Sequence, residues 1–311
     1  MFPVDKARGG VVFCKQGPVS GPETEVNILK RSTHFVISIL LVLCLAAAPL
    51  WATAAVWGDV TGEGKISTED ARYALRAAIG LENYEKGTPE FAGADIIADG
   101  KITTDDARLI LRIAVGLEPA VNQYDILRTG TFYLEGDMDG NGSPMKMAVS
   151  KELVYLEAYT DGIAIGYLVK GKDVYLLSPA DKVYHRITAA DKALMKSADI
   201  EFMDETEVRS MVDEFGFDKM PPLDQADTVT GAKLDGTPCA VYTYNLSDGS
   251  KTCVYMYGYR LLAFSSVSAD GKTVSMMKFT SVSADVPTLP PKGYQSVLLS
   301  VLIVKMVKRM G

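Results

Sequence analysis

Oxygen-bearing side chains recur at one spacing in two stretches of the chain. Residues 59–82 read DVTGEGKISTEDARYALRAAIGLE, and residues 95–118 read DIIADGKITTDDARLILRIAVGLE. The stretches are offset by 36 residues and are identical at 14 of 24 aligned positions, which indicates an internal duplication. Each opens with a twelve-residue loop rich in carboxylates and hydroxyls, and such oxygens are the ligands that calcium prefers. The pattern therefore predicts calcium binding.

A helix must follow each loop to position its last carboxylate. In the first loop Gly64 permits the sharp turn, and Asp70 falls in the first turn of the helix, where a carboxylate suits the helix dipole. Apolar residues then recur at helical spacing, and they predict the buried stripes Ala71, Ala74, Leu75, Ala78 and Ile79, then Ala107, Ile110, Leu111, Ala114 and Val115. Gly80 and Gly116 are expected to end the two helices.

The tandem pattern D-x-x-x-[DE]-G-K-I-[ST]-T-x-D-A-R resembles the repeat of dockerin domains over roughly residues 57–120. The resemblance implies a small all-α module that binds Ca²⁺. The ligands that it implies are Asp59, Thr61, Glu63, the Lys65 carbonyl and Asp70 in the first loop, and Asp95, Asp99, the Lys101 carbonyl and Asp106 in the second. Ile97 stands at the third position of the second loop and has no side-chain oxygen. We therefore expect one strong site and a weaker second one.

Dockerins bind cohesin-type modules of scaffold proteins, often in polysaccharide-degrading assemblies, so the resemblance implies such a partner. The contact positions that it implies are Thr68, Glu69, Arg76, Thr104, Asp105 and Arg112. The residues add one observation of their own, because Tyr73 and Ala77 of the first helix become Leu109 and Ile113 in the second. These positions lie off the apolar stripe, so we expect Tyr73, Leu109 and Ile113 to belong to an exposed partner surface. Burial under a neighbouring domain is the alternative, and calcium could also serve only to hold a small module together.

Residues 124–295 change character and read as strands. The runs rich in Val, Ile, Tyr and Thr are 129–134, 146–150, 153–159, 163–169, 174–177, 183–187, 239–244, 252–259, 261–267 and 273–279. Helical segments are expected near 189–197 and 205–215, between the two sets of strands. The fold class predicted is therefore multidomain: a small all-α calcium-loop module, then an α+β domain whose long curved antiparallel sheet carries helices on one face.

The β domain weakly resembles the half-barrel of bacterial lipoprotein-carrier and lipoprotein-sorting proteins. The segments that carry this are TGTFYLEG, MKMAVS and VYLEAY, the hairpin DVYLLSPADKVYHRI and the closing PTLPPKGYQSV. The resemblance implies a fold that can hold an acyl chain or an apolar peptide. A two-residue turn at Asp248-Gly249 would place Tyr255 opposite Tyr242 and would put Cys239 and Cys253 on opposite faces, whereas a longer loop would change that parity.

Both ends of the chain carry apolar segments. Lys30-Arg31, the apolar run 35–48 and Ala52-Thr53-Ala54 predict that residues 1–54 are a signal peptide or a retained N-terminal anchor in contact with a membrane. Residues 296–311 are apolar and then basic, and the run of eight residues VLLSVLIV is too short to cross a bilayer as a helix. This tail is expected either to lie on a membrane surface or to pack on the domain as a terminal helix or strand.

Composition excludes several classes of function. The net charge of −7 argues against a nucleic-acid-binding surface, and two histidines and four cysteines are too few for the usual zinc sites. No catalytic constellation emerges, so the protein is not expected to be an enzyme. The domains predicted are 1–54, 55–120, 121–295 and 296–311. The function expected is that of a secreted or surface-attached calcium-dependent adaptor bearing a non-catalytic β domain. The alternatives are an apolar-ligand or lipid carrier with a dockerin address tag, and a dockerin-borne polysaccharide hydrolase.

Overall fold

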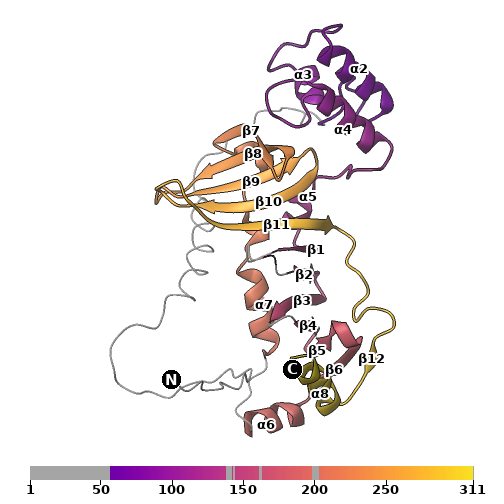
Figure 1. Ribbon diagram of the computed structural model, residues 1–311, viewed down its shortest axis with the longest axis vertical. Helices are drawn as coiled ribbons and strands as arrows, with labels where there is room; N and C mark the ends of the chain where they lie inside the picture. The colour runs from indigo at the N-terminus through magenta and orange to yellow at the C-terminus, as the bar shows by residue number, and fades with distance from the viewer. Residues whose placement is uncertain (1–56, 138–141, 143, 161–162, 198–202, 311) are drawn as a thin grey trace, which may run out of the picture.

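The computed structural model describes residues 57–137, 142, 144–160, 163–197 and 203–310, and the predicted signal peptide or anchor lies outside these ranges. The molecule is elongated (Figure 1). The loop–helix module lies at one end, and helices α6 and α8 lie at the other. Within the described ranges, no helix combines the length and the apolar character needed to cross a bilayer.

The duplication in the sequence is repeated in the structure of the module. Its helices are α2 Thr68–Ala78, α3 Pro89–Ala94 and α4 Thr104–Ala114. A capping box begins each long helix, formed by Ser67 with Asp70 and by Thr103 with Asp106. Glycines at positive φ end both helices as predicted: Gly80 at 77° and Gly116 at 76°. The residue after each glycine returns its N–H to a carbonyl of the last turn, as in a Schellman motif.

The buried face of each helix differs from the predicted stripe. Ala71, Ala74, Ala107 and Ile110 are buried, but the larger stripe residues are 44% to 59% exposed: Leu75, Ile79, Leu111 and Val115. Leu109 and Ile113 are 0% and 4% exposed, so the expectation that they form an exposed partner surface is wrong. The reason is the β domain, since the turn at Gly258 lies against Leu109, and Tyr257 joins the core of the module.

A single twelve-stranded sheet is the framework of the β domain. The first six strands are β1 Phe132–Asp137, β2 Pro144–Val149, β3 Leu153–Thr160, β4 Ile163–Lys170, β5 Asp173–Ser178 and β6 Val183–Arg186. The others are β7 Thr228–Leu234, β8 Thr237–Asn245, β9 Lys251–Tyr257, β10 Arg260–Val267, β11 Thr273–Ser283 and β12 Gln295–Ser296. Their spatial order is β12-β6-β5-β4-β3-β2-β1-β11-β10-β9-β8-β7. Only the short β12–β6 pair is parallel among the described pairs, so the sheet is mostly antiparallel and does not close.

Strands β1 and β11 join the two meanders into this one sheet. The register shifts between Glu135 and Gly136, and a Cβ at Gly136 would lie 2.2 Å from the Lys278 carbonyl oxygen, so the close approach requires glycine. Helix α5 Gln123–Arg128, which was not predicted from the sequence, lies at this junction and bonds to strands β10 and β11. The Gln123 side chain donates to the Val282 carbonyl at 2.8 Å and accepts from the Leu261 N–H at 3.0 Å.

The main core lies on one face of the sheet, beneath the helices. Helix α7 Glu205–Asp213 contacts β3 and β4, and helix α8 Leu299–Met310 contacts β4, β5 and β6. Helix α6 Ala189–Ser197 adds the buried Met195 to the same core. The opposite face holds smaller clusters, one of which includes Leu289 and Tyr294 from the segment after β11. The α+β fold with a curved antiparallel sheet and packed helices is therefore confirmed.

The β8–β9 register differs from the one expected. Asn245 pairs with Lys251, so the connecting loop is longer than two residues and shifts the partners by one. Tyr242 consequently lies opposite Val254, and the prediction that Tyr255 opposes it is wrong. Cys239 and Cys253 belong to one buried cluster as free thiols, so the prediction that they occupy opposite faces is also wrong.

His185 joins the elements at the helical end of the molecule. Its Nδ1 lies 2.8 Å from the Val297 carbonyl oxygen, and its Nε2 lies 3.0 Å from Oδ2 of Asp191 in the first turn of α6. The two ring nitrogens thus face one main-chain carbonyl and one carboxylate. Hydrogen bonds from Thr188, and then from His185, lower the pKa of Asp191 to about 2. This places His185 in a packing role.

The first prediction concerns the dependence of stability on pH. A carboxylate whose pKa is depressed in the folded state stabilises the protein above its ordinary pKa, and this stability is lost as the pH falls from about 4 to about 2. We expect the melting temperature of the wild type to fall by a few degrees more than that of Asp191→Asn across this range. Thermal melts at pH 2 to 5 measure it, with Asp213→Asn, an exposed carboxylate of α7, as control. Parallel curves for the wild type and Asp191→Asn would contradict the prediction.

Candidate functional site

The two carboxylate loops share one hydrogen-bonding scheme. In the first, Asp59 accepts from the backbone N–H groups of Glu63 at 3.0 Å and Gly64 at 2.7 Å. In the second, Asp95 accepts from Asp99 at 3.1 Å and Gly100 at 2.9 Å. The same scheme at equivalent positions shows that both loops adopt one conformation.

The last carboxylate of each loop closes it from the helix. Asp70 accepts from the Thr61 N–H at 2.9 Å and the Ser67 N–H at 2.8 Å. Asp106 accepts from the Ile97 N–H at 3.0 Å and the Thr103 N–H at 2.8 Å. These bonds fix each carboxylate between the start of the loop and the start of the helix, where the sequence places the closing ligand.

Burial makes the carboxylates of the second loop hard to ionise together. Burial first, and then the charge of Asp106, raise the pKa of Asp95 to about 7, and burial also raises the pKa of Asp106. Burial acts in the same sense on Asp70, but hydrogen bonds from Ser67 and Thr61 hold its pKa below the ordinary value. A bound cation would relieve the repulsion in the second loop.

The oxygen donors suit calcium in type, because they are carboxylates and hydroxyls with main-chain carbonyls in reach along the loop. In the part of the chain that the structure describes, no cluster of three or more His, Cys, Asp or Glu side chains is arranged to hold a metal. Calcium binding therefore stays a prediction for both loops. The expected ligands are Asp59, Thr61, Glu63, Lys65 and Asp70 in the first loop, and Asp95, Asp99, Lys101 and Asp106 in the second. Thr61, Glu63 and Lys65 are exposed.

The second loop is packed against the sheet, whereas the first is open. A Cβ at Gly231 of β7 would lie 2.6 Å from the Asp99 Cβ, and Ala98 packs against the main core. Trp57, at the start of the module, stacks on Tyr242 with ring centroids 6.0 Å apart. The Tyr259 hydroxyl donates to the Trp57 carbonyl at 2.7 Å. The β domain thus limits access to the second loop.

The residues predicted to contact a partner also differ in exposure between the first and the second repeat. Thr68, Glu69 and Arg76 are exposed on α2, and Tyr73 is partly buried beneath Arg72. On α4, Thr104 is exposed, but Asp105 is partly buried. Arg112 pairs with Glu118 at 3.0 Å, as Arg76 of α2 pairs with Glu82 at 2.9 Å. Glu118 also lies 3.8 Å from Arg260 of the β domain. The first repeat therefore offers the more open helical face, and its Leu75 and Ile79 were assigned to the core by the sequence pattern.

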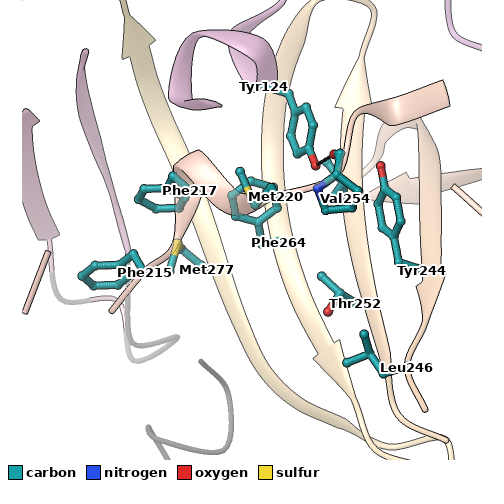
Figure 2. Close-up of a pocket in the computed structure, with 11 residues that line it drawn as sticks. Tyr124, Phe215, Phe217, Met220, Tyr244, Leu246, Thr252, Val254, Phe264 and Met277 are labelled. Atoms are coloured by element: carbon teal, nitrogen blue, oxygen red, sulfur yellow. Dashed lines mark hydrogen bonds between the residues drawn. The ribbon is translucent and has the colours of Figure 1, made fainter. Parts of the chain in front are cut away.

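A second candidate site is an apolar pocket between the sheet and the segment after α7 (Figure 2). Its lining comes from α5, from residues 215–221 and from strands β8 to β11: Tyr124, Phe215, Phe217, Met220, Pro221, Tyr244, Leu246, Thr252, Val254, Phe264 and Met277. The cavity measures about 30 Å³, room for about two water molecules. The resemblance to lipoprotein carriers implied only that the fold can hold an apolar ligand. The residues of the pocket could not be predicted, because the segment 215–221 that forms one wall has no helical or strand periodicity.

Phe217, which lines this pocket, contacts three other aromatic rings. Its ring contacts Phe132 at 5.5 Å and Phe215 at 5.6 Å between centroids, and it meets Phe264 of β10 at 6.1 Å. Tyr244 anchors the covering segment by donating to the Pro222 carbonyl at 3.0 Å. In this conformation the protein's own side chains leave only a small space in the pocket.

The known proteins that this chain resembles are distant. No family model matches it, and no curated protein matches it either. Solved structures that it resembles include an uncharacterized conserved protein from Thermus thermophilus, at 12% identity and a TM-score of 0.28, over 56% of this chain and 96% of that one. Another is MucB in complex with MucA(peri), at 12% identity and a TM-score of 0.23, over 54% of this chain and 55% of that one. Likenesses this distant carry no argument. What the geometry defines is an α+β protein with an open curved sheet and a small loop–helix module.

The second prediction concerns calcium. We expect calorimetric titration of the full chain to show that Asp59→Ala weakens the tighter calcium site by about tenfold or more, since it removes one charged ligand. Asp95→Ala is expected to affect only the weaker site, because Ile97 gives that loop one side-chain oxygen fewer. Glu69→Ala removes an exposed carboxylate just outside the ligand set and serves as control. A wild-type titration curve for Asp59→Ala would show that the first loop does not hold the ion.

Proposed function

We propose that this protein is a secreted or surface-attached adaptor whose loop–helix module docks, in its calcium-bound form, onto a cohesin-type module of a scaffold protein. The observation that carries the proposal is the shared hydrogen-bonding scheme of the two loops, in which equivalent carboxylates are held by equivalent backbone N–H groups. Calcium in these loops would fix the helices relative to one another. The docking surface would therefore depend on the metal.

The exposed face of α2 supports this assignment. Thr68, Leu75 and Ile79 are spaced by seven and four residues and share one side of the helix. Leu75 and Ile79 are 44% and 59% exposed, and the charged Glu69 and Arg76 flank them. An apolar strip with a charged rim is typical of a protein-binding surface. The β domain would be the non-catalytic cargo, and the assembly that the resemblance suggests is one that degrades polysaccharides.

The third prediction tests docking with the full chain. We expect purified cohesin-type modules to bind in calcium and to dissociate in chelator. Leu75→Asp/Ile79→Asp should weaken the affinity by about tenfold or more, because two anchor side chains are replaced by charges. Interferometry with immobilised cohesin modules measures it.

Two comparisons keep this test specific. Leu111→Asp/Val115→Asp makes the same change at the equivalent positions of α4, and a smaller effect there is expected because the β domain covers the neighbouring Leu109 and Ile113. Val274→Asp alters an exposed valine of β11, which pairs with β1 and β10, and should have no effect. If no cohesin-type module binds while calcium still binds, the module is a structural clip, and the docking proposal fails.

A second candidate is a carrier of apolar ligands, and the aromatic pocket is the observation that favours it. As it stands, its volume of about 30 Å³ is far too small for an acyl chain. A ligand would have to displace Phe217 and the segment around it. The carrier function therefore requires a second conformation, in which residues 215–221 move away from β10.

The fourth prediction separates a ligand site from a filled core. Phe217→Ala should lower the stability by about 3–5 kcal/mol, because it leaves a cavity among aromatic rings. If the site accepts apolar ligands, a fatty acid should raise the melting temperature of Phe217→Ala by several degrees. Tyr159→Ala, at a tyrosine that is 41% exposed, is the control and should show neither effect. Loss of stability without recovery in fatty acid would count against a carrier.

A further inference from the structure

The helical end of the molecule, opposite the module, presents a surface that combines apolar and basic side chains. Helix α8 packs one side on the sheet through Leu299, Leu302 and Met306, which are buried in the main core. Its other side faces solvent and carries Val301 and Val304, which are 41% and 51% exposed. The helix therefore exposes apolar residues on the side where a surface helix is ordinarily polar.

Lysines alternate with these valines on the same side of the helix. Lys305 and Lys308 follow Val301 at four and seven residues, which places all three on one face beside Val304. A shallow groove beside the helix is lined by these four residues, together with Ser300 and the Asp181–Arg309 ion pair. Val307 and Leu298 extend the apolar part and are 56% and 71% exposed.

The neighbouring helix α6 has the same character. Leu194 is 63% exposed, and Lys192 and Lys196 flank it in the sequence. The carboxylate of its acidic residue, Asp191, is hydrogen-bonded to Thr188 and His185. His185 also bonds the Val297 carbonyl just before α8, so the two helices are held at one end of the protein (Figure 1).

Charge decides between the partners that such a surface could bind. Residues 296–311 contain three basic residues and no acidic one, although the whole chain has a net charge of −7. A second copy of this face would bring lysine against lysine, which disfavours self-association through it. Exposed valines beside lysines match the chemistry of an anionic bilayer, whose headgroups pair with ammonium groups while apolar side chains enter the interface.

We propose that the end formed by α8 and α6 binds the surface of an anionic lipid membrane. Val301, Val304 and Val307 insert at the interface, and Lys305 and Lys308 pair with lipid phosphates. The binding is peripheral, because α8 stays packed on the sheet through its buried side. It is independent of the docking proposal, since it uses the opposite end of the molecule.

Sedimentation of the full chain with vesicles tests the proposal. Vesicles of phosphatidylcholine with about 30% phosphatidylglycerol should bind the wild type more tightly than vesicles of phosphatidylcholine alone. Lys305→Glu/Lys308→Glu should reduce partitioning onto the anionic vesicles by about tenfold or more. Val301→Asp/Val304→Asp should do the same. Matched controls at exposed residues of the strands are Lys233→Glu/Lys251→Glu and Val229→Asp/Val274→Asp, which should bind as the wild type does.

Hydrogen exchange supplies a local measurement that the N-terminal apolar segment cannot imitate. Amides of residues 299–310 should exchange more slowly when anionic vesicles are present. Unchanged exchange in α8, or variants of α8 that bind as the controls do, would overturn the proposal. Light scattering that shows a dimer of the wild type, which the α8 variants abolish, would assign the surface to self-association and also overturn it. Lys305→Gln/Lys308→Gln, with an intermediate loss expected, replaces the charge reversal if that variant does not fold.

Discussion

The pairing of β1 with β11 is the constraint on which the rest of the structure depends. Both meanders contribute residues to the main core, and their junction makes the apolar face continuous. The junction brings residues far apart in the chain into register, such as Tyr133 with Ser283, and it relies on Gly136, where any side chain would meet the Lys278 carbonyl. Gln123 then bonds both β10 and β11 beside it. Helix α5 contacts both β10 and β11 at this junction.

The module is attached to that sheet through several kinds of contact. Trp57 stacks on tyrosines of the β domain, Leu109 meets the turn at Gly258, and the second loop reaches Gly231. These contacts cover much of the second repeat and leave the first more open. Two repeats that are similar in sequence therefore differ in their exposure to solvent. A cation in the second loop would therefore also affect the contacts with the sheet, whereas a cation in the first loop would affect the module alone.

Local signals in the sequence were sufficient for much of the fold. The repeat, the helix ends at Gly80 and Gly116, and ten of the twelve described strands follow from spacing, propensity and turn residues, whereas β7 and the short β12 were not predicted. Other failures concern loop length and contacts with a distant neighbour. The turn at Gly258 lies against Leu109, which is buried, whereas the equivalent Tyr73 is only partly buried, and no helical periodicity contains that information. The β8–β9 register failed because one loop was longer than its Asp-Gly pair suggests. The pocket wall at Phe217 lies in a segment without any period.

The breadth of the sheet also sets a distance. The module meets the sheet at β7, and α8 packs on β4 to β6 near the other edge. Neighbouring strands lie about 4.8 Å apart, so the two ends are on the order of 40–50 Å from one another before curvature shortens the path. Because the spacing is fixed by backbone hydrogen bonds across one continuous ladder, the sheet acts as a rigid spacer. Whatever holds one end of the protein therefore fixes the height and the direction at which the other end is presented.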